Sequence, residues 1–471
     1  MWVSAGGAKR ARSARTTSRV PTVRAQHPES PQCTDPRHFF RHGVPAPLHR
    51  TACDGSDNPH VICLPSCAQY VTVVGGGNST PIFAALAADA GHTVAILTRR
   101  PTDWDANDIG FVNDDLGYCD GKTEFRTKIA LVTADPAECI PQSDMIFIAG
   151  LPIHHNPEVL RKIKPHMDMS KRVYVGSICA YGGFNWVAAE ALGEGAYSLF
   201  GTQLIPWCCG TKEYGRTGAI FGAKRLLRIA TEGGEDKDGV VPILAKILKM
   251  PFLTHTDFIA STLWPNNPSL HPPILYGLFK DWDGQTPYDP ATLPTLIYAD
   301  LRTDSAKTLV AEDLELCAIA KKLSEMYPNN RHLKSNFSMH HCVNENYLEQ
   351  ITCKWDAVSS IITNKAFSKH KIPYTQVEGG VVPTLQHKFF ETDLPFGLCT
   401  FVDIARMIGV ETPTIDAMIC WNQKLIGKEY MTATGLIDGR DAGECVLPSK
   451  LGLTATTLEY GFRGGTPAEI S

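Results

Sequence analysis

The hydrophobic pattern of residues 71–100 predicts a strand, a helix and a second strand in succession. Residues 71–74 read Val-Thr-Val-Val, a β-branched run that suits a buried parallel strand. An apolar helical pattern over residues 81–90 stops at Gly91, and a second apolar run covers residues 93–97. Together these segments predict a βαβ unit.

The same alternation of strands and helices continues along the first half of the chain. Three further apolar runs predict strands, at residues 128–133, 145–149 and 172–175. Such alternation predicts a right-handed, mostly parallel, doubly wound sheet. His154 and His155 follow the second of these runs, at the edge where such sheets bind ligands. They either contact a ligand or have a structural role.

Beyond residue 251 the pattern takes on a helical period, and strand signals become few. Residues 304–327 predict a long amphipathic helix, and residues 401–408 and 414–424 predict two shorter ones. The apolar positions that we expect to be buried in the long helix are Leu309, Leu314, Leu316, Ile319 and Leu323.

Three consecutive glycines, Gly75, Gly76 and Gly77, join the first strand to the first helix, and Asn78 follows them. Glycine permits a sharp turn and a close approach of bare backbone to a ligand, and a helix N-terminus attracts a pyrophosphate. With a strand before and a helix after it, the loop matches a dinucleotide-binding fingerprint, although Thr80 stands at the third glycine position. The alternative is a structural βαβ unit of a phosphate-binding or flavodoxin-like domain.

These patterns predict an α/β, Rossmann-like doubly wound domain at residues 68–252 and a mainly α-helical domain at residues 253–471. Residues 1–67 carry six Lys and Arg before the first acidic residue, Glu29, among many Ser, Thr and Ala. Such a leader is typical of an organelle transit peptide, of a disordered basic tail, or of sequence upstream of the true start. We favour the tail, because the stretch lacks a clean amphipathic helix, and expect a cytoplasmic protein with organelle targeting left open.

Composition narrows the function classes. A chain of 471 residues with 43% hydrophobic residues can bury two cores, and a net charge of −4 gives no sign of nucleic-acid or anionic-membrane binding. No apolar run reaches the length of a membrane span. The fifteen cysteines are scattered, without zinc spacing or a CxxC pair. We therefore expect free thiols in a reducing compartment and no metal.

Two turn-rich segments of the second half combine titratable side chains with sequence that does not look helical. Residues 264–282 place His271 between a leucine and two prolines, and residues 387–398 contain Lys388 and Asp393. A histidine fixed by a carboxylate is a common device for moving a proton to or from a carbonyl oxygen, and a nearby cation can hold a substrate carboxylate. The alternative is an ordinary surface histidine and an acidic loop.

Several longer motifs resemble the opine dehydrogenase family, the octopine, tauropine, strombine and alanopine dehydrogenases. The resemblance extends from about residue 68 to the C-terminus. The motifs are GGGN at 75–78, PWCCGTKEYGR at 206–216, LHPPILYGLFKDWDG at 270–284, KFFETDLPFGL at 388–398 and IGKEY at 426–430.

The resemblance implies reductive condensation of an α-keto acid, expected to be pyruvate, with the amino group of an amino acid, at the expense of NADH or NADPH. It also implies that His271 is the acid/base, that Asp393 orients it, and that Lys388 binds substrate. Lys388 stands where the family has arginine, and it lacks the planar fork that grips a carboxylate at two points. Thr392 replaces a glutamate, and Ser79-Thr80 replace a smaller Gly-Ala pair.

The choice between NADH and NADPH depends on Thr98 and Arg99. NAD-binding units usually carry an acid about twenty residues after the glycines, where it binds the ribose 2′-hydroxyl. Here that position is Thr98, followed by Arg99 and Arg100, which suit a 2′-phosphate. The invertebrate enzymes that the chain resembles mostly use NADH without that acid. Both cofactors stay open, with a lean toward acceptance of NADPH.

Three other classes compete with this interpretation: a two-domain NAD(P)-dependent dehydrogenase of the hydroxy-acid or glycerol-phosphate type, a non-catalytic nucleotide sensor, and a thiol redox protein. The presence of both His271 and Asp393 disfavours the sensor, and the lack of a CxxC motif disfavours the redox protein. The expected partners are small molecules, an α-keto acid and an amino acid, with no nucleic acid and no membrane. The sequence leaves the identity of the amino acid and the oligomeric state open.

Overall fold

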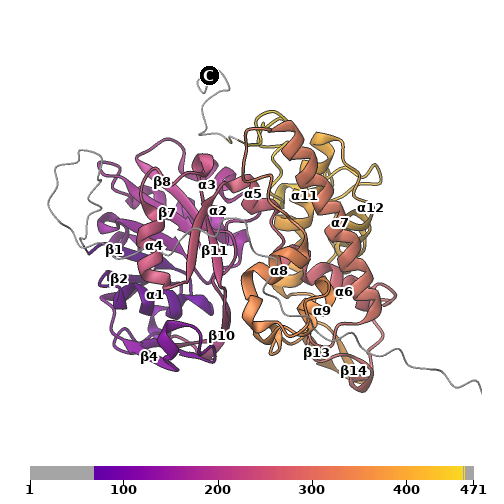
Figure 1. Ribbon diagram of the computed structural model, residues 1–471, viewed down its shortest axis with the longest axis horizontal. Helices are drawn as coiled ribbons and strands as arrows, with labels where there is room; N and C mark the ends of the chain where they lie inside the picture. The colour runs from indigo at the N-terminus through magenta and orange to yellow at the C-terminus, as the bar shows by residue number, and fades with distance from the viewer. Residues whose placement is uncertain (1–67, 460, 462–471) are drawn as a thin grey trace, which may run out of the picture. The chain divides into compact units, whose positions relative to one another are not determined.

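The computed structural model describes residues 68–459 and 461. Its first half is an α/β assembly and its second half is mainly helical (Figure 1). The predicted fold class is therefore confirmed. The predicted leader, residues 1–67, lies outside the described residues.

An eight-stranded sheet forms the centre of the first half, in the order β12-β11-β8-β7-β6-β1-β2-β5. All neighbouring strands run parallel except β8 and β11, which are antiparallel. The strands are β1 (Tyr70–Val74), β2 (Thr93–Leu97), β5 (Leu131–Thr133), β6 (Met145–Ile148), β7 (Val173–Ser177), β8 (Tyr197–Thr202), β11 (Leu226–Thr231) and β12 (Phe252–Thr256). The helices of this half are α1 (Ser79–Asp89), α2 (Asn156–Ile163), α3 (Phe184–Leu192), α4 (Val240–Leu248) and α5 (Phe258–Leu263).

A second sheet of four strands, in the order β4-β3-β10-β9, packs against α1. Its strands are β3 (Ile109–Asn113), β4 (Glu124–Thr127), β9 (Trp207–Glu213) and β10 (Thr217–Ala223). A Cβ atom at Gly218 of β10 would lie 2.4 Å from Ile82 of α1, so glycine allows this close contact. Because α1 is covered on more than one face, every residue from 79 to 87 is buried, as expected for a helix that is apolar all round.

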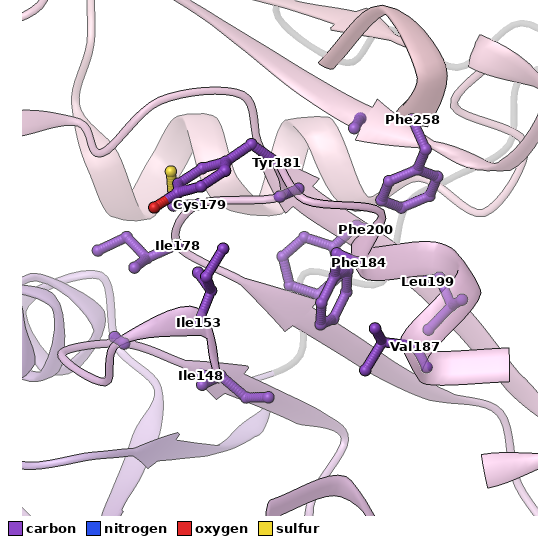
Figure 2. Close-up of a cluster of buried hydrophobic side chains, with 14 of the residues drawn as sticks. Ile148, Ile153, Ile178, Cys179, Tyr181, Phe184, Val187, Leu199, Phe200 and Phe258 are labelled. Carbon is purple, nitrogen blue, oxygen red and sulfur yellow. The ribbon is translucent and has the colours of Figure 1, made fainter. Parts of the chain in front are cut away.

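Large apolar side chains fill the space between the main sheet and its helices. Figure 2 shows one such cluster, where residues of β8 and of the segment after β7 meet Phe184 and Val187 of α3 and Phe258 of α5. The rings of Phe147 and Phe200, on β6 and β8, stack 5.5 Å apart. This packing fixes the carboxyl ends of β6 and β7, from which the loops to the cavity begin.

The second half is built around the long helix α7 (Thr303–Met326), which packs against α6, α11 and α12. A Cβ atom at Gly277 of α6 would lie 2.3 Å from the backbone nitrogen of Ser305, so the two helices pack closely there. The other helices are α6 (His271–Phe279), α8 (Met339–Tyr347), α9 (Ala357–Ile362), α10 (Lys388–Glu391), a π-helical turn at Leu394–Leu398, α11 (Cys399–Ile408) and α12 (Pro413–Leu425). A small hairpin, β13 (Tyr374–Val377) and β14 (Gly380–Pro383), follows α9.

The structure corrects several expectations. The segment around His271 is helical, because Pro272 and Pro273 occupy the first turn of α6, where a missing backbone N–H costs nothing. Residues 388–391 are also helical. Leu314 on α7 was expected to be buried but is 67% exposed. The strand predicted at 128–133 covers only the last three of those positions.

The boundary predicted between residues 252 and 253 stays a prediction. The last strand of the main sheet, β12, spans residues 252–256. In the described part of the chain, no helix is both long and apolar enough to cross a membrane.

Candidate active site

One cavity, with a volume of about 480 Å³, is lined by residues from both halves of the chain. The first half contributes the end of the glycine loop at Gly77 and Asn78, the loop that follows β6, and Cys208 and Cys209 of β9. The second half contributes His271, Tyr298, the α8 residue Tyr347 and the segment that carries Lys388 and Asp393. All three residues predicted for catalysis and substrate binding therefore lie around a single space that reaches the glycine loop.

The glycine loop lies so close to the segment after β6 that only glycine fits at two of its positions. A Cβ atom at Gly75 would lie 2.2 Å from the carbonyl oxygen of Ala149, and one at Gly77 would lie 2.4 Å from that of Gly150. Gly75 also has a φ of +130°, which disfavours other residues. The loop leads into α1, whose first turn carries no acidic side chain and no side-chain cap. The N–H of Thr80 donates to the carbonyl of Gly77 and Pro81 has no N–H, so the N–H groups of Asn78 and Ser79 are the ones that suit the pyrophosphate of a dinucleotide.

Hydrogen bonds to neighbouring segments hold Thr80 and Asn78, which follow the three glycines, in place. The hydroxyl of Thr80 donates a 2.8 Å hydrogen bond to the carbonyl of Ala149, at the end of β6. Space for it comes from Gly150, where a Cβ atom would lie 2.3 Å from the Thr80 hydroxyl. The side chain of Asn78 accepts a 2.7 Å hydrogen bond from Thr211, which ties the loop to β9.

His271 and Asp393 form a buried pair, although they are 122 residues apart in sequence. Nδ1 of His271 lies 2.8 Å from Oδ2 of Asp393, and the two residues are 5% and 2% exposed. Because a carboxylate can only accept, Nδ1 carries the proton of this bond. Nε2 of His271 lies 2.9 Å from the hydroxyl of Tyr298, which donates to it when the imidazole is neutral. The imidazole is thus held at both nitrogens.

Aromatic residues complete the surroundings of the pair. The ring of Phe389 stacks on His271 at a centroid distance of 3.6 Å, and the hydroxyl of Tyr181 lies 3.4 Å from Oδ1 of Asp393. Burial lowers the pKa of His271, and the hydrogen bond to Asp393 counteracts part of that effect. Burial also raises the pKa of Tyr298 well above its usual range. A neutral imidazole beside a protonated phenol can exchange protons with a substrate near neutral pH.

His154 and His155 lie in the loop after β6, and His154 contacts the segment that carries Asp393. Nδ1 of His154 lies 2.9 Å from the hydroxyl of Thr392, the residue directly before Asp393. Burial and the neighbouring His155 lower the pKa of His154 to about 4, so this contact is between neutral groups. His154 therefore has a structural contact that joins the loop after β6 to the segment of Asp393.

Three lysines line the cavity: Lys224, Lys371 and Lys388. Lys388, the first residue of α10, is exposed, and its ammonium lies 6.0 Å from the centroid of Phe389. Lys224 lies between β10 and β11 and is 6% exposed. The sequence-based interpretation missed Lys224, Tyr298 and Tyr181. None of them has a local sequence signal, because each depends on chain segments that meet only in the folded protein.

Thr98 and Arg99 follow the end of β2, close to the glycine loop. Thr98 is buried, and a Cβ atom at Gly76 would lie 3.0 Å from its hydroxyl. Arg100 lies over the ring of Tyr214 at 4.4 Å and pairs with Asp103 at 3.5 Å. Within residues 68–459 and 461, Arg99 is exposed and forms no hydrogen bond or ion pair. Of the two arginines, Arg99 is therefore the one available to a ligand.

Comparison with known proteins shows which enzymes the chain is similar to. Residues 254–426 match the model described as "NAD/NADP octopine/nopaline dehydrogenase, alpha-helical domain". The tauropine dehydrogenase of Arabella iricolor is 29% identical over 399 residues, which cover 81% of this chain and 97% of the relative. The opine dehydrogenase of Haliotis discus hannai is 28% identical over 403 residues, covering 81% and 96%. The chain is therefore similar to opine dehydrogenases over most of its length, and its helical half matches the model of their helical domain.

A solved structure of octopine dehydrogenase, described with NADH and L-arginine, agrees with this assignment. It has a TM-score of 0.70 and 26% identity to this chain, and the match covers 84% of this chain and 99% of that one. The family resemblance predicted from the sequence is thus confirmed. This similarity disfavours the alternative interpretation, a two-domain dehydrogenase of the hydroxy-acid or glycerol-phosphate type.

The described residues contain free cysteines but no cluster of side chains suited to a metal ion. There, eleven cysteines are free thiols, and no group of three or more His, Cys, Asp or Glu side chains is arranged to hold a metal ion. The lining of the cavity includes imidazole, carboxylate, phenol and ammonium groups, together with the backbone of the glycine loop.

Proposed function

We propose that this protein is an opine dehydrogenase, which condenses an α-keto acid, in the first place pyruvate, with the amino group of an amino acid. The product is a secondary amine, an N-(1-carboxyethyl) amino acid when the keto acid is pyruvate. The observation that carries the proposal is the buried pair His271–Asp393 in a cavity that also reaches the glycine loop.

His271 is assigned the proton transfers of the condensation. With Nδ1 bonded to Asp393, Nε2 is the atom that accepts a proton from the incoming ammonium group, which takes the place of the Tyr298 hydroxyl at that nitrogen. The amine nitrogen then bonds to the keto carbon and gives one of its protons to the carbonyl oxygen, and Nε2 returns its proton to the resulting hydroxyl, which departs as water and gives the protonated imine. Asp393 stabilises the imidazolium that forms in between.

The glycine loop and the start of α1 are assigned to the nicotinamide cofactor. The crowding at Gly75 and Gly77 and the uncapped N-terminus of α1 fit a dinucleotide. Gly75, Gly76, Gly77 and Asn78 would hold the pyrophosphate side, while Thr98 and Arg99 would lie near the adenosine ribose. When bound, the reduced nicotinamide supplies the hydride that converts the imine to the secondary amine.

We assign to Lys388 the role of binding the carboxylate of the keto acid. Its backbone lies in the four-residue helix α10, next to Phe389, which stacks on His271. The keto-acid carboxylate is bonded directly to the reacting carbon, so its partner must lie close to the imidazole. An exposed ammonium at this point provides an electrostatic hold on one or both oxygens, without the two-point geometry of an arginine.

A turnover assay tests the proposal. Purified protein is mixed with pyruvate, a panel of amino acids and either NADH or NADPH, and oxidation of the cofactor is followed by absorbance. We expect oxidation only when keto acid and amino acid are both present. Mass spectrometry should find a product equal in mass to the two substrates combined, minus water and plus two hydrogen atoms.

Two controls make the result specific. Pyruvate without an amino acid tests for a simple hydroxy-acid dehydrogenase, and the amino acid without pyruvate tests for amino-acid oxidation. Oxidation of the cofactor by the keto acid alone, with no secondary amine formed, would contradict the proposal.

We also propose the division of the chain into a leader at 1–67, a dinucleotide-binding domain at 68–252 and a catalytic helical domain at 253–471, and a cytoplasmic location. The free thiols of the described residues support a reducing compartment. A fluorescent reporter fused to residues 1–67 should stay diffuse in the cytoplasm, and accumulation in an organelle would identify a transit signal instead.

A further inference from the structure

Lys224 is an unusual residue in this cavity because it is a buried cation with no carboxylate partner. Its ammonium donates to the carbonyl of Ile205 and, at 2.7 Å, to the hydroxyl of Tyr347. An ammonium has three N–H donors, so one remains. In the described part of the chain, no Asp or Glu forms an ion pair with Lys224.

The groups around Lys224 do not neutralise it. The titratable side chains that act on it electrostatically are the thiols of Cys179, Cys208 and Cys209. Burial raises the pKa of Cys179 and of Cys209 to about 12, and it also raises that of Cys208. The thiols are therefore uncharged at neutral pH. A buried ammonium without a counter-ion is costly, and a bound anion would remove that cost.

The backbone around Lys224 is held rigidly. The backbone N–H of Lys224 donates a 3.0 Å hydrogen bond to the carbonyl of Pro206. The backbone N–H of Arg225 donates a 2.7 Å hydrogen bond to the carbonyl of Asn346 on α8. Lys224 also connects β10 of the small sheet to β11 of the main sheet. The ammonium is thus placed at a fixed point of the cavity wall, as a binding group should be.

Aromatic contacts place Lys224 on the substrate side of the cavity. Its ammonium lies 5.0 Å from the ring centroid of Tyr347, which lies 5.1 Å from that of Phe367. Phe367 in turn lies 4.7 Å from Tyr298, the hydroxyl partner of His271. A continuous aromatic wall therefore leads from the imidazole to Lys224, and all of these residues line the cavity.

We propose that Lys224 binds the acidic group, carboxylate or sulfonate, of the amine substrate, while Lys388 binds the carboxylate of the keto acid. The inference rests on the proposed function, because the condensation brings two acidic substrates into one cavity. Lysines line that cavity in separate segments of the chain, among them Lys224 before β11 and Lys388 in α10. The amino acid would thereby be oriented with its amino group toward the keto carbon and Nε2 of His271.

The test changes the enzyme and the substrate together. First the preferred amino acid is found in wild type, and then it is compared with the amine that lacks only its acidic group. With pyruvate fixed, kcat/KM is measured for both amines in wild type, in Lys224→Gln and in Lys224→Met. Lys246→Gln is the matched control, because it removes the same charge from an exposed position on α4.

We expect wild type to favour the amine with the acidic group by roughly ten- to a hundredfold, as for a charge-assisted contact. In both Lys224 variants that preference should collapse toward unity, through a raised KM for the amino acid. The KM for pyruvate and the affinity for NADH should stay within about threefold, and Lys246→Gln should behave as wild type. A preference that survives in the Lys224 variants would overturn the proposal.

Further outcomes are also decisive. If the KM for pyruvate rises instead, Lys224 holds the keto acid and the assignment is wrong. If wild type uses both amines equally well, the proposal falls without any variant, which covers the case in which the variants fail to fold. Thermal unfolding and NADH binding report folding separately. If no pair of substrates is converted by wild type, the proposed function itself falls, and this inference falls with it.

Discussion

The two sides of the cavity are constructed in different ways. On the N-terminal side, we expect ligand contacts from the backbone, because Gly75 and Gly77 leave no room for side chains and α1 begins without a side-chain cap. On the C-terminal side, contacts come from side chains that hold one another, such as His271, Asp393 and Tyr298. The difference indicates that changes on the first side should alter cofactor affinity, while changes on the second should alter turnover.

Removal of the imidazole should give the largest separation of these two properties. In His271→Ala, we expect kcat to fall by roughly 10²–10⁴, the usual range for loss of a general acid–base group. The dissociation constant for NADH, measured by fluorescence titration, should stay nearly unchanged, because the glycine loop is intact. Near-normal turnover of this variant would rule out His271 as the acid/base.

Asp393→Asn should produce a smaller loss of turnover on the same side of the cavity. The amide can still lie beside Nδ1 of His271, but it cannot stabilise the imidazolium as a carboxylate does. We expect kcat to fall by at least roughly tenfold, with NADH affinity retained. A pH profile of kcat identical to that of wild type would mean that Asp393 does not act through His271.

Gly77→Ala should give the opposite pattern. The added Cβ would lie 2.4 Å from the carbonyl oxygen of Gly150, and such overpacking typically costs about 1–3 kcal/mol. Cofactor affinity should therefore fall by roughly ten- to a hundredfold, while kcat at saturating cofactor should change little. Gly443→Ala is the control, because a Cβ there meets nothing within 4 Å. A fall in kcat without weaker cofactor binding would break the division between the two sides.

Lys388→Ala sharpens the comparison within the C-terminal side. Loss of an exposed ammonium should raise the KM for the keto acid by roughly tenfold and leave NADH affinity unaltered. Lys388→Arg restores the residue that the family carries and should lower that KM, because the guanidinium can bind two oxygens. Unchanged KM values for both organic substrates in Lys388→Ala would show that the side chain faces elsewhere.

Arg99→Ala should give the smallest effect. An exposed guanidinium is screened by solvent, so we expect a fall in kcat/KM for NADPH of roughly three- to tenfold and no change for NADH. Arg100→Ala is the matched control, since Arg100 is engaged by Tyr214 and Asp103. Thr98→Asp should shift preference toward NADH by repelling the 2′-phosphate. Strict use of NADH by wild type, with no response to Arg99→Ala, would reject the lean toward NADPH.

The sequence predicted those parts of the molecule that depend on local pattern. The βαβ unit follows from a β-branched run, three glycines and an apolar helix, all within thirty residues. The long helix α7 was expected at 304–327 and spans Thr303–Met326, because its apolar period is sustained over many turns. The pairing of His271 with Asp393 came from the family resemblance, since nothing in the spacing joins residues 122 positions apart.

Other features depended on contacts that no local pattern records. The small sheet was missed, since β9 reads WCCGTKE, which has little apolar alternation, and since β10 pairs with β3, which lies far earlier in the chain. Leu314 is exposed although it suited the apolar stripe, while Glu312 is fully buried on the same helix. The helical start at His271 was obscured by two prolines, which the first turn of a helix tolerates.

The contacts of Asp393 and Thr392 with the first half determine how chimeras between this chain and its relatives should be designed. The hydroxyl of Tyr181 lies near Asp393, and His154 bonds Thr392, so the loops after β6 and β7 both contact the segment that carries the aspartate. A chimera that exchanges only residues 253–471 between relatives would pair a foreign aspartate segment with these loops. The natural unit of exchange is therefore the helical half together with residues 150–182, with crossovers placed inside the sheet rather than at the boundary between the halves.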